Sequence, residues 1–327
     1  MKTTIIICTK DREKDLIGCI NSINRQTVLP NELIIVDDGN LDNSIIANRV
    51  NKKIKLRYFK KSIPGLPASR NLGVRNSLGD VIFFFDDDIV LHKDYIKNIL
   101  MLYRDDSSKV IKGMGGLVKQ KRRKLYDGIK EFLESITLVR PRRPGIVSHF
   151  GFCNAFQEHH FKKICNQIPN KINVQSLSGC CMSFRKEIFK EILFDKNLTG
   201  YALGEDLDFT YRIFKKYPKG LYICPRAKIF HKMSKISRIN IKDESYKSIV
   251  FKFYFFKKYI EKTFKNYFIN IWSIFGLFFL DIFSIIALLF ITPGLTKIRS
   301  QRLIGHLKGL TIISKVILLK RNIKNYL

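Results

Sequence analysis

Three consecutive aspartates, Asp86, Asp87 and Asp88, follow the apolar run "VIFFF" of residues 81–85. Carboxylates this close repel one another unless they are protonated, solvated or neutralised by a cation. Mg²⁺ and Mn²⁺ bind one or two protein carboxylates and complete their coordination with water and phosphate oxygens, so an Asp-x-Asp arrangement suits a metal–diphosphate site. A solvated acidic loop is the alternative, but three acids directly after an apolar strand favour the cation.

Two further polar groups follow apolar or turn-forming stretches. Asp37 and Asp38 come after "ELIIV" and before a glycine, where a carboxylate could accept hydrogen bonds from a base or a ribose. An Asp-Gly turn explains the same residues equally well. Arg70 lies early in a helix predicted after the loop "PGLPAS". Its guanidinium could fork onto a phosphate or stack on a base, and a surface ion pair is the alternative.

A third acidic group, Glu205, Asp206 and Asp208, opens a helix predicted over residues 204–220. Acidic side chains in the first turn are favoured by the helix dipole. The residues alone therefore require nothing beyond stabilisation of the helix terminus.

The first hundred residues alternate short apolar runs with helix-like spacing, which predicts a mostly parallel sheet flanked by helices and hence an α/β fold. The predicted strands are residues 3–8, 32–39, 55–60 and 80–88, and the predicted helices are 12–25, 42–50, 67–78 and 92–104. Strands of such a sheet present their carboxyl ends to a ligand crevice. The polar clusters therefore belong to one edge of the sheet.

The pattern is weaker over residues 105–175, which we interpret as loops carrying two basic clusters, residues 119–124 and 140–144. These clusters are either solvated surface or a patch for phosphates or an anionic membrane. Residues 176–192 then predict a strand that leads into a helix, and residues 221–232 predict one more strand.

The C-terminal part has a different character. Residues 267–291 contain a single charge, Asp281, and are long enough to span a bilayer. Both flanks are basic, which opposes a simple span, and a carboxylate at mid-membrane is costly. A span and a helical hairpin lying in the membrane interface both remain open, and the tail has the amphipathic pattern of interfacial helices. We predict a domain of residues 1–235 and a membrane-associated region of residues 236–327.

The composition sets broader limits. The net charge of +31 should attract polyanions: nucleic acid, anionic lipid or phosphorylated substrates. The seven cysteines are scattered and odd in number, which indicates reduced thiols in the cytoplasm. The N-terminal apolar run is too short for a signal peptide, so no export is expected.

Taken together, "IIICTKDR", "IIVDDG", "PGLPASRNLGVRNSLGDVIFFFDDDIVL", "SGCCMSFRKEIF" and "GEDLDFTYRIFKK" resemble the family 2 inverting glycosyltransferases of the GT-A fold. The resemblance covers about residues 1–235. It implies a Rossmann-like mixed sheet flanked by helices and a metal-dependent transfer of one sugar, with inversion, from a nucleotide sugar. No Q-x-x-R-W motif follows "GED", so single addition is expected in place of processive polymerisation.

The resemblance also assigns roles to individual positions. Its implied nucleotide-sugar contacts are Thr9, Asp37, Asp38, Arg70, Asp86 and Asp87. Asp86 and Asp88 match the metal-binding Asp-x-Asp, with His231 as a further metal or diphosphate ligand, and the metal is Mg²⁺ or Mn²⁺. Asp206 matches the catalytic base with Glu205 beside it, and Gly179 matches a small residue that lines the acceptor pocket.

The expected partners are a UDP- or dTDP-linked sugar, a lipid-linked or cell-surface glycan, and the cytoplasmic face of the cell membrane. Two alternatives stand beside this hypothesis. A sugar nucleotidyltransferase would use a similar sheet, but "CTKDREKD" lacks the expected glycine-rich loop. A nucleic-acid-binding protein would suit the charge, but the aromatic residues are concentrated away from the basic segments, so no nucleic acid is expected.

Overall fold

The computed structural model describes residues 1–119, 133–139, 145–148, 169–199, 202–234, 236, 239–291, 296–319 and 322–326. Contacts divide the chain into two compact units. The first comprises Met1–Lys121, Ala155–Gly200 and Glu205–Ser237, and the second comprises Arg122–Asn154, Tyr201–Gly204 and Arg238–Leu327. The units are built from interleaved stretches, so the simple division at residue 235 stays a prediction. The basic clusters of residues 119–124 and 140–144 lie outside the described residues, apart from Lys119.

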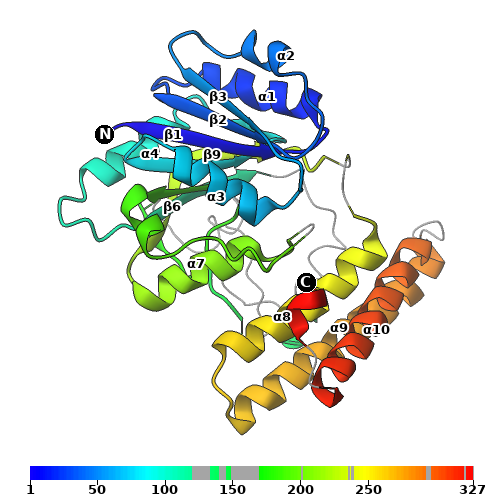
Figure 1. The fold of residues 1–327 in the computed structure, drawn as a ribbon. Helices are drawn as coiled ribbons and strands as arrows, with labels where there is room; N and C mark the ends of the chain where they lie inside the picture. The colour runs from blue at the N-terminus through cyan, green and yellow to red at the C-terminus, as the bar shows by residue number, and fades with distance from the viewer. Residues whose placement is uncertain are drawn as a thin grey trace. The chain divides into compact units, whose positions relative to one another are not determined.

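Among the described residues, the strands of the first unit form one nine-stranded sheet in the order β3-β2-β1-β4-β8-β6-β9-β5, with β7 paired to β9 (Figure 1). The strands are β1 (Thr3–Thr9), β2 (Glu32–Asp37), β3 (Lys55–Lys60), β4 (Val81–Asp86), β5 (Ile89–Leu91), β6 (Gly113–Lys119), β7 (Ile172–Asn173), β8 (Cys181–Arg185) and β9 (Leu221–His231). Strands β1 to β4 are mutually parallel, whereas β8 runs antiparallel to both β4 and β6. The predicted α/β class with a mixed sheet is confirmed.

Apolar runs form the central strands because both faces of the sheet are covered. Ile5 and Ile7 of β1 pack into one core and Ile6 into the other, as the alternation of side chains along a strand requires. Helices α1 (Glu13–Asn24) and α4 (Tyr95–Arg104) contribute to the first core. Helices α3 (Leu66–Asn76) and α7 (Glu205–Lys216) contribute to the second. Packing on both faces therefore fixes the carboxyl ends of β1, β2 and β4.

The predicted strands and helices of the first hundred residues are confirmed, with the helix predicted over 42–50 reduced to α2 (Asn43–Ala47). Strand β6 was expected to be loop. Its sequence "GMGGLVK" lacks an apolar alternation, and it pairs because glycines permit close approach. A Cβ on Gly113 would lie 2.5 Å from the Phe184 ring, and one on Gly116 would lie 2.5 Å from the Ala227 carbonyl oxygen. After β8 the chain forms a 3-10 helix, η1 (Lys186–Lys190), where an α-helix was predicted.

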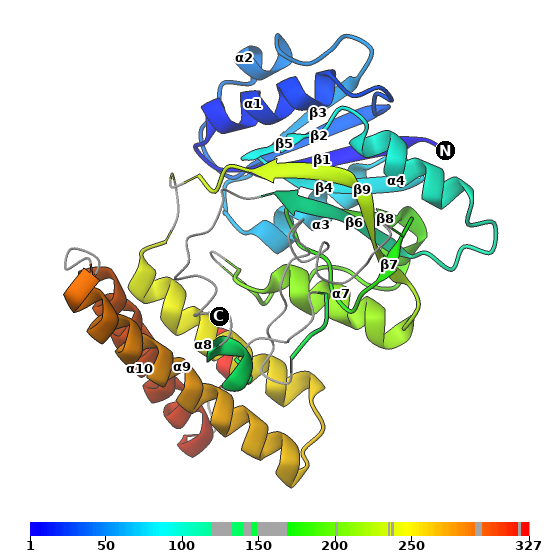
Figure 2. The ribbon, with the colours of Figure 1, turned by 180° about the vertical axis from the view of Figure 1, so that it is seen from behind.

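Three helices build most of the described part of the second unit: α8 (Ile241–Tyr259), α9 (Phe264–Ile291) and α10 (Thr296–Leu318), followed by the short η3 (Ile323–Tyr326) (Figure 2). Helix α10 approaches α8 closely, because a Cβ on Gly305 would lie 2.3 Å from a carbonyl oxygen of α8. The segment Phe264–Ile286 of α9 is long and apolar enough to cross a membrane. The predicted apolar helix and the helical tail are therefore both present.

Candidate functional site

The candidate site lies where strands β1, β2 and β4 end. The parallel register places Thr9 opposite Asp37 and Cys8 opposite Asp86, so the polar residues that follow these strands share one edge of the sheet. The same unit brings in the end of β9 and the first turn of α7. Thus motifs separated by more than a hundred residues contribute to one place.

The three consecutive aspartates have different surroundings, and the middle one, Asp87, is bonded within the protein. Asp87 is buried and accepts hydrogen bonds from the Thr9 hydroxyl at 2.7 Å and from the Arg12 guanidinium at 3.1 Å. Burial raises the pKa of Asp87 to about 6, although the Thr9 and Arg12 bonds oppose the rise. Asp87 therefore ties the end of β4 to the end of β1.

Asp86 and Asp88 converge with His231, and one donor atom from each lies within 4.8 Å of the others. The Nε2 atom of His231 lies 2.9 Å from a carboxylate oxygen of Asp88, and the backbone N–H of Ser234 donates to the other oxygen at 2.8 Å. Burial alone would lower the pKa of His231, but its hydrogen bonds to Asp88 and Cys180 outweigh the effect of burial and raise the pKa to about 10. Two carboxylates and an imidazole are ligands that fit Mg²⁺ or Mn²⁺, Mn²⁺ tolerating the nitrogen better.

The pair after β2 is engaged within the protein. Asp37 is fully buried and accepts from Gly39, Leu41 and Tyr58. Burial would raise the pKa of Asp37, but these hydrogen bonds and Lys60 hold it below its ordinary value.

Asp38 organises the loop that leads into α3. Its carboxylate accepts from the Lys61 ammonium at 3.0 Å, the Ser69 hydroxyl at 2.8 Å and the Gly65 N–H at 2.9 Å. With 9% of its side chain exposed, Asp38 borders the surface, whereas Asp37 does not reach it.

Arg70 is buried and forms an ion pair with Glu205, 135 residues away in the chain. Its guanidinium also donates to the Gly179 carbonyl at 3.2 Å, lies 3.6 Å from Asp86, and packs beside two phenylalanine rings. Burial would lower the pKa of Arg70, but Glu205 and Asp86 raise it. The pairing predicted as a surface alternative is thus real but buried, and it links the aspartate cluster to α7.

Glu205 and Asp206 differ in their access to ligands. Burial raises the pKa of Glu205, with Asp206 adding to the rise and Arg70 opposing it. One of its oxygens is buried with no hydrogen-bond partner among the described residues. Asp206 is half-buried and accepts from the Gly179 N–H at 2.8 Å and the Leu207 N–H at 2.9 Å. These two donors fix the direction of a carboxylate that is able to reach a ligand.

Gly179 is small for a physical reason. A Cβ there would lie 3.1 Å from the Arg70 guanidinium and 3.1 Å from the Asp206 carboxylate. The absence of a side chain lets the backbone N–H approach Asp206. All sequence-predicted site residues therefore gather in the first unit.

The sequence reasoning missed Arg12 and Lys61. Arg12 bonds to Asp87 and also donates to the Ile236 carbonyl at 2.8 Å. Lys61 bonds to Asp38. The sequence signal that could have identified them was charge balance, because each buried carboxylate at this edge needs a cation or a hydrogen-bond donor. Lys61 directly follows β3, and Arg12 lies three residues after the end of β1.

Comparisons with known proteins identify the family and the fold. The model of the family described as "Glycosyl transferase family 2" matches residues 4–193. An uncharacterized glycosyltransferase of Rickettsia felis is 27% identical over 191 residues, covering 55% of this chain and 29% of the relative. The chondroitin synthase of Pasteurella multocida is 26% identical over 231 residues, covering 65% of this chain and 23% of the relative.

Among solved structures, GalNAc-T7 with UDP, GalNAc and Mn²⁺ matches with a TM-score of 0.54 and 15% identity, covering 80% of this chain and 49% of that one. This likeness concerns the fold, and it confirms the GT-A architecture that the resemblance implied. The chain spans less than a third of the length of the curated relatives named above.

Proposed function

Because the chain belongs to glycosyl transferase family 2, we propose that it transfers one sugar from a UDP- or dTDP-linked donor, with inversion, to a glycan acceptor. The observation that carries the proposal is the convergence of Asp86, Asp88 and His231 in the same unit as the separately held Asp206. Inverting transfer needs these two kinds of site, one for the departing diphosphate and one for the acceptor proton.

On the donor side, Asp86, Asp88 and His231 would hold Mg²⁺ or Mn²⁺. The chemistry that such a cation supplies, when bound, is neutralisation of the charge that develops on the departing diphosphate. Thr9 and Asp38 lie at the ends of neighbouring strands, where the nucleoside would bind. Asp37 and Asp87 are buried and accept hydrogen bonds that keep the strand ends in position.

On the acceptor side, Asp206 would act as the general base. The acceptor oxygen attacks the anomeric carbon, the bond from that carbon to the diphosphate oxygen breaks, and the acceptor proton passes to the Asp206 carboxylate. Each carboxylate oxygen already accepts one N–H bond and keeps a second lone pair for this proton. A positioned base of this kind contributes roughly 10²- to 10⁴-fold.

Arg70 and Glu205 act in our proposal as positioning residues. Arg70 bonds to Gly179 and Glu205 and lies 3.6 Å from Asp86. It therefore fixes the position of the metal ligands relative to the base. Misplacing a reacting group by about 1 Å can cost roughly 10²-fold in rate, which makes such a brace valuable.

We propose that the acceptor is a lipid-linked or cell-surface glycan and that the enzyme works at the cytoplasmic face of the cell membrane. The apolar helix α9 and the basic net charge support the membrane location. The similarity to a chondroitin synthase supports a glycan acceptor.

Calorimetry with UDP tests the donor site. Binding should require Mn²⁺ or Mg²⁺, disappear with a chelator, and disappear in Asp88→Ala, while the exposed Asp105→Ala keeps it. Screening nucleotide sugars for release of the nucleoside diphosphate then identifies the donor. Metal-independent binding would contradict the donor-site assignment, and formation of pyrophosphate from a nucleoside triphosphate and a sugar phosphate would favour the nucleotidyltransferase alternative.

A further inference from the structure

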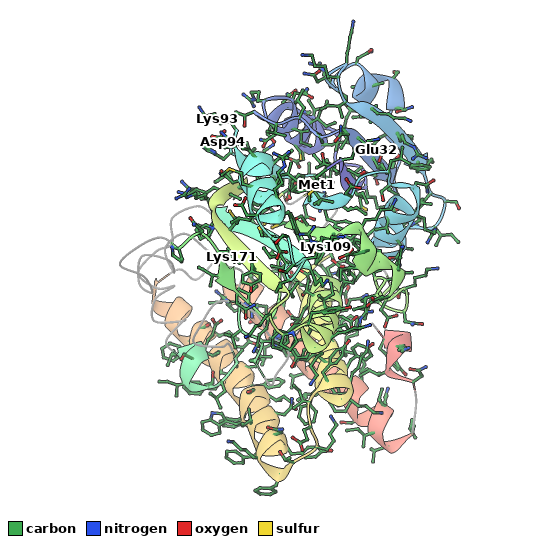
Figure 3. The ribbon with its side chains drawn as sticks, turned by 90° about the vertical axis from the view of Figure 1, so that its left-hand side faces the viewer. Met1, Glu32, Lys93, Asp94, Lys109 and Lys171 are labelled. Atoms are coloured by element: carbon green, nitrogen blue, oxygen red, sulfur yellow. The ribbon has the colours of Figure 1, made fainter. Side chains whose placement is uncertain are left out.

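Helix α9 has two chemically different faces. One face exposes aromatic and aliphatic side chains at helical spacing from Phe264 to Ile286, and rings project outward from the pale orange α9 in Figure 3. These residues, each at least 40% exposed, are Phe264, Tyr267, Phe268, Ile271, Trp272, Phe275, Phe279, Ile282, Phe283 and Ile286. From residue 264 to 286 the stripe is about 33 Å long. So large an apolar face normally has an occupant.

The opposite face of α9 is buried within the helical unit and carries the polar residues Asn270, Ser273, Asp281 and Ser284. Asp281 is 2% exposed and lies 2.5 Å from the Nδ1 atom of His306 on α10, with Arg302 at 3.6 Å. The Ser273 hydroxyl donates to the Leu138 carbonyl at 3.1 Å. The charge that seemed costly in the sequence is therefore satisfied by α10, and it fastens α9 to that helix.

This pairing decides against a span. Helix α10 carries basic residues along its length, at Lys297, Arg299, Arg302, Lys308 and Lys315. If α9 crossed a bilayer while packed on α10, several of these would enter hydrocarbon, where Lys and Arg are strongly disfavoured. If α9 crossed alone, Asp281 would lose His306 and enter the hydrocarbon unpaired. Neither arrangement is compatible with the contacts of the unit.

We infer that α9 lies in the plane of an anionic membrane surface, with its exposed stripe inserted among the headgroups and upper acyl chains and its polar face held by α10. The inference specifies the membrane contact within the proposed function. The occupant of the stripe is lipid and not a second copy of the chain, because of the charge that surrounds the stripe.

The charge around the stripe suits anionic headgroups. Between residues 238 and 327, Lys and Arg number sixteen against four Asp and Glu. Four exposed lysines lie between the last turn of α8 and the first turn of α9: Lys257, Lys258, Lys262 and Lys265. An amphipathic helix with an apolar face and flanking basic residues binds anionic interfaces. Two copies meeting through this stripe would bring two strongly positive regions together, which opposes self-association.

The chain contains one tryptophan, Trp272, and it lies on the stripe with its ring 40% exposed. It is therefore a native reporter of depth. In a span over residues 264–286, Trp272 would lie about 4.5 Å from the bilayer midplane. In the interfacial arrangement it would lie near the headgroups.

The chain of residues 1–327, diluted from mild detergent, is mixed with vesicles of phosphatidylcholine or of phosphatidylcholine with phosphatidylglycerol. We expect at least tenfold tighter binding to the anionic vesicles, and stronger quenching of Trp272 by lipids brominated near the glycerol than by lipids brominated near the chain ends. Stronger quenching by the deep bromines would overturn the inference in favour of a span. Absence of vesicle binding, with a stable dimer in solution, would overturn it in favour of a second copy.

Substitutions on the stripe sharpen the test. Phe275→Glu, at a position 65% exposed, should weaken vesicle binding at least tenfold, while Met101→Glu, at an exposed position on α4, should leave it unchanged. Equal binding by both variants would contradict a role for the stripe. UDP binding with Mn²⁺ is measured on the same samples, because it should persist in Phe275→Glu. In the unaltered protein, absence of vesicle binding with intact UDP binding refutes only the membrane inference, whereas absence of UDP binding refutes the proposed donor site.

Discussion

The substitution Asp206→Asn separates the chemical role of Asp206 from its structural one. The carboxylate accepts two backbone N–H bonds, from Gly179 and Leu207. An amide side chain has only one oxygen, so one of these donors loses its acceptor, at a cost of about 1–3 kcal/mol. For a domain of this size we expect the melting temperature to fall by roughly 2–4 °C for each kcal/mol.

The catalytic loss should be much larger than the structural one. Removing a general base costs roughly 10²- to 10⁴-fold, or about 3–5 kcal/mol in the activation barrier. Donor affinity should stay within about threefold, because the diphosphate binds at Asp86 and Asp88. The measurements are acceptor-dependent release of nucleoside diphosphate and calorimetry with UDP and Mn²⁺.

Asp208→Asn is the matched control. Asp208 lies in the same first turn of α7, is fully buried and pairs with Arg212 at 2.9 Å, so its substitution removes an equal charge from the same helix terminus. We expect it to lower stability while the transfer rate stays within a fewfold range. If Asp206→Asn keeps more than a tenth of the parent rate, or if Asp208→Asn falls as far, Asp206 is not the base.

Three more predictions concern other residues of the two units. Gly179→Ala places a Cβ 3.1 Å from the Asp206 carboxylate, so initial rates should fall about tenfold while calorimetric UDP affinity is kept; unchanged rates would refute the close approach. Arg12→Ala removes a cation from Asp87, whose pKa of about 6 should then rise further. A carboxyl whose pKa is raised in the folded state destabilises the folded protein as the pH rises through that pKa. The drop in melting temperature caused by Arg12→Ala should therefore be larger at pH 8 than at pH 5. An equal drop at both pH values would exclude the Arg12–Asp87 pair as its cause. Gly309→Leu, whose side chain would collide with α8, should lower helicity in circular dichroism and leave UDP binding intact.

Much of the first unit could be predicted from local patterns. The runs before Asp37 and Asp86 are apolar at successive positions because strands β2 and β4 are covered on both faces, and such burial leaves a direct trace in the sequence. The acids at the strand ends could be identified because they directly follow these apolar runs. Strand β6 left no such trace, because its glycines are required by close contacts with the Phe184 ring and the Ala227 carbonyl, which are distant in the chain.

The sequence by itself determined which residue types stand at the strand ends, and the order of the motifs pointed to the family. Only the tertiary structure decided the partners: Arg70 with Glu205, Asp87 with Thr9 and Arg12, and Asp281 with His306. Periodicity records whether a position is buried, since burial depends on the local element. It does not record which distant group meets a buried charge, because that choice is made when the elements pack.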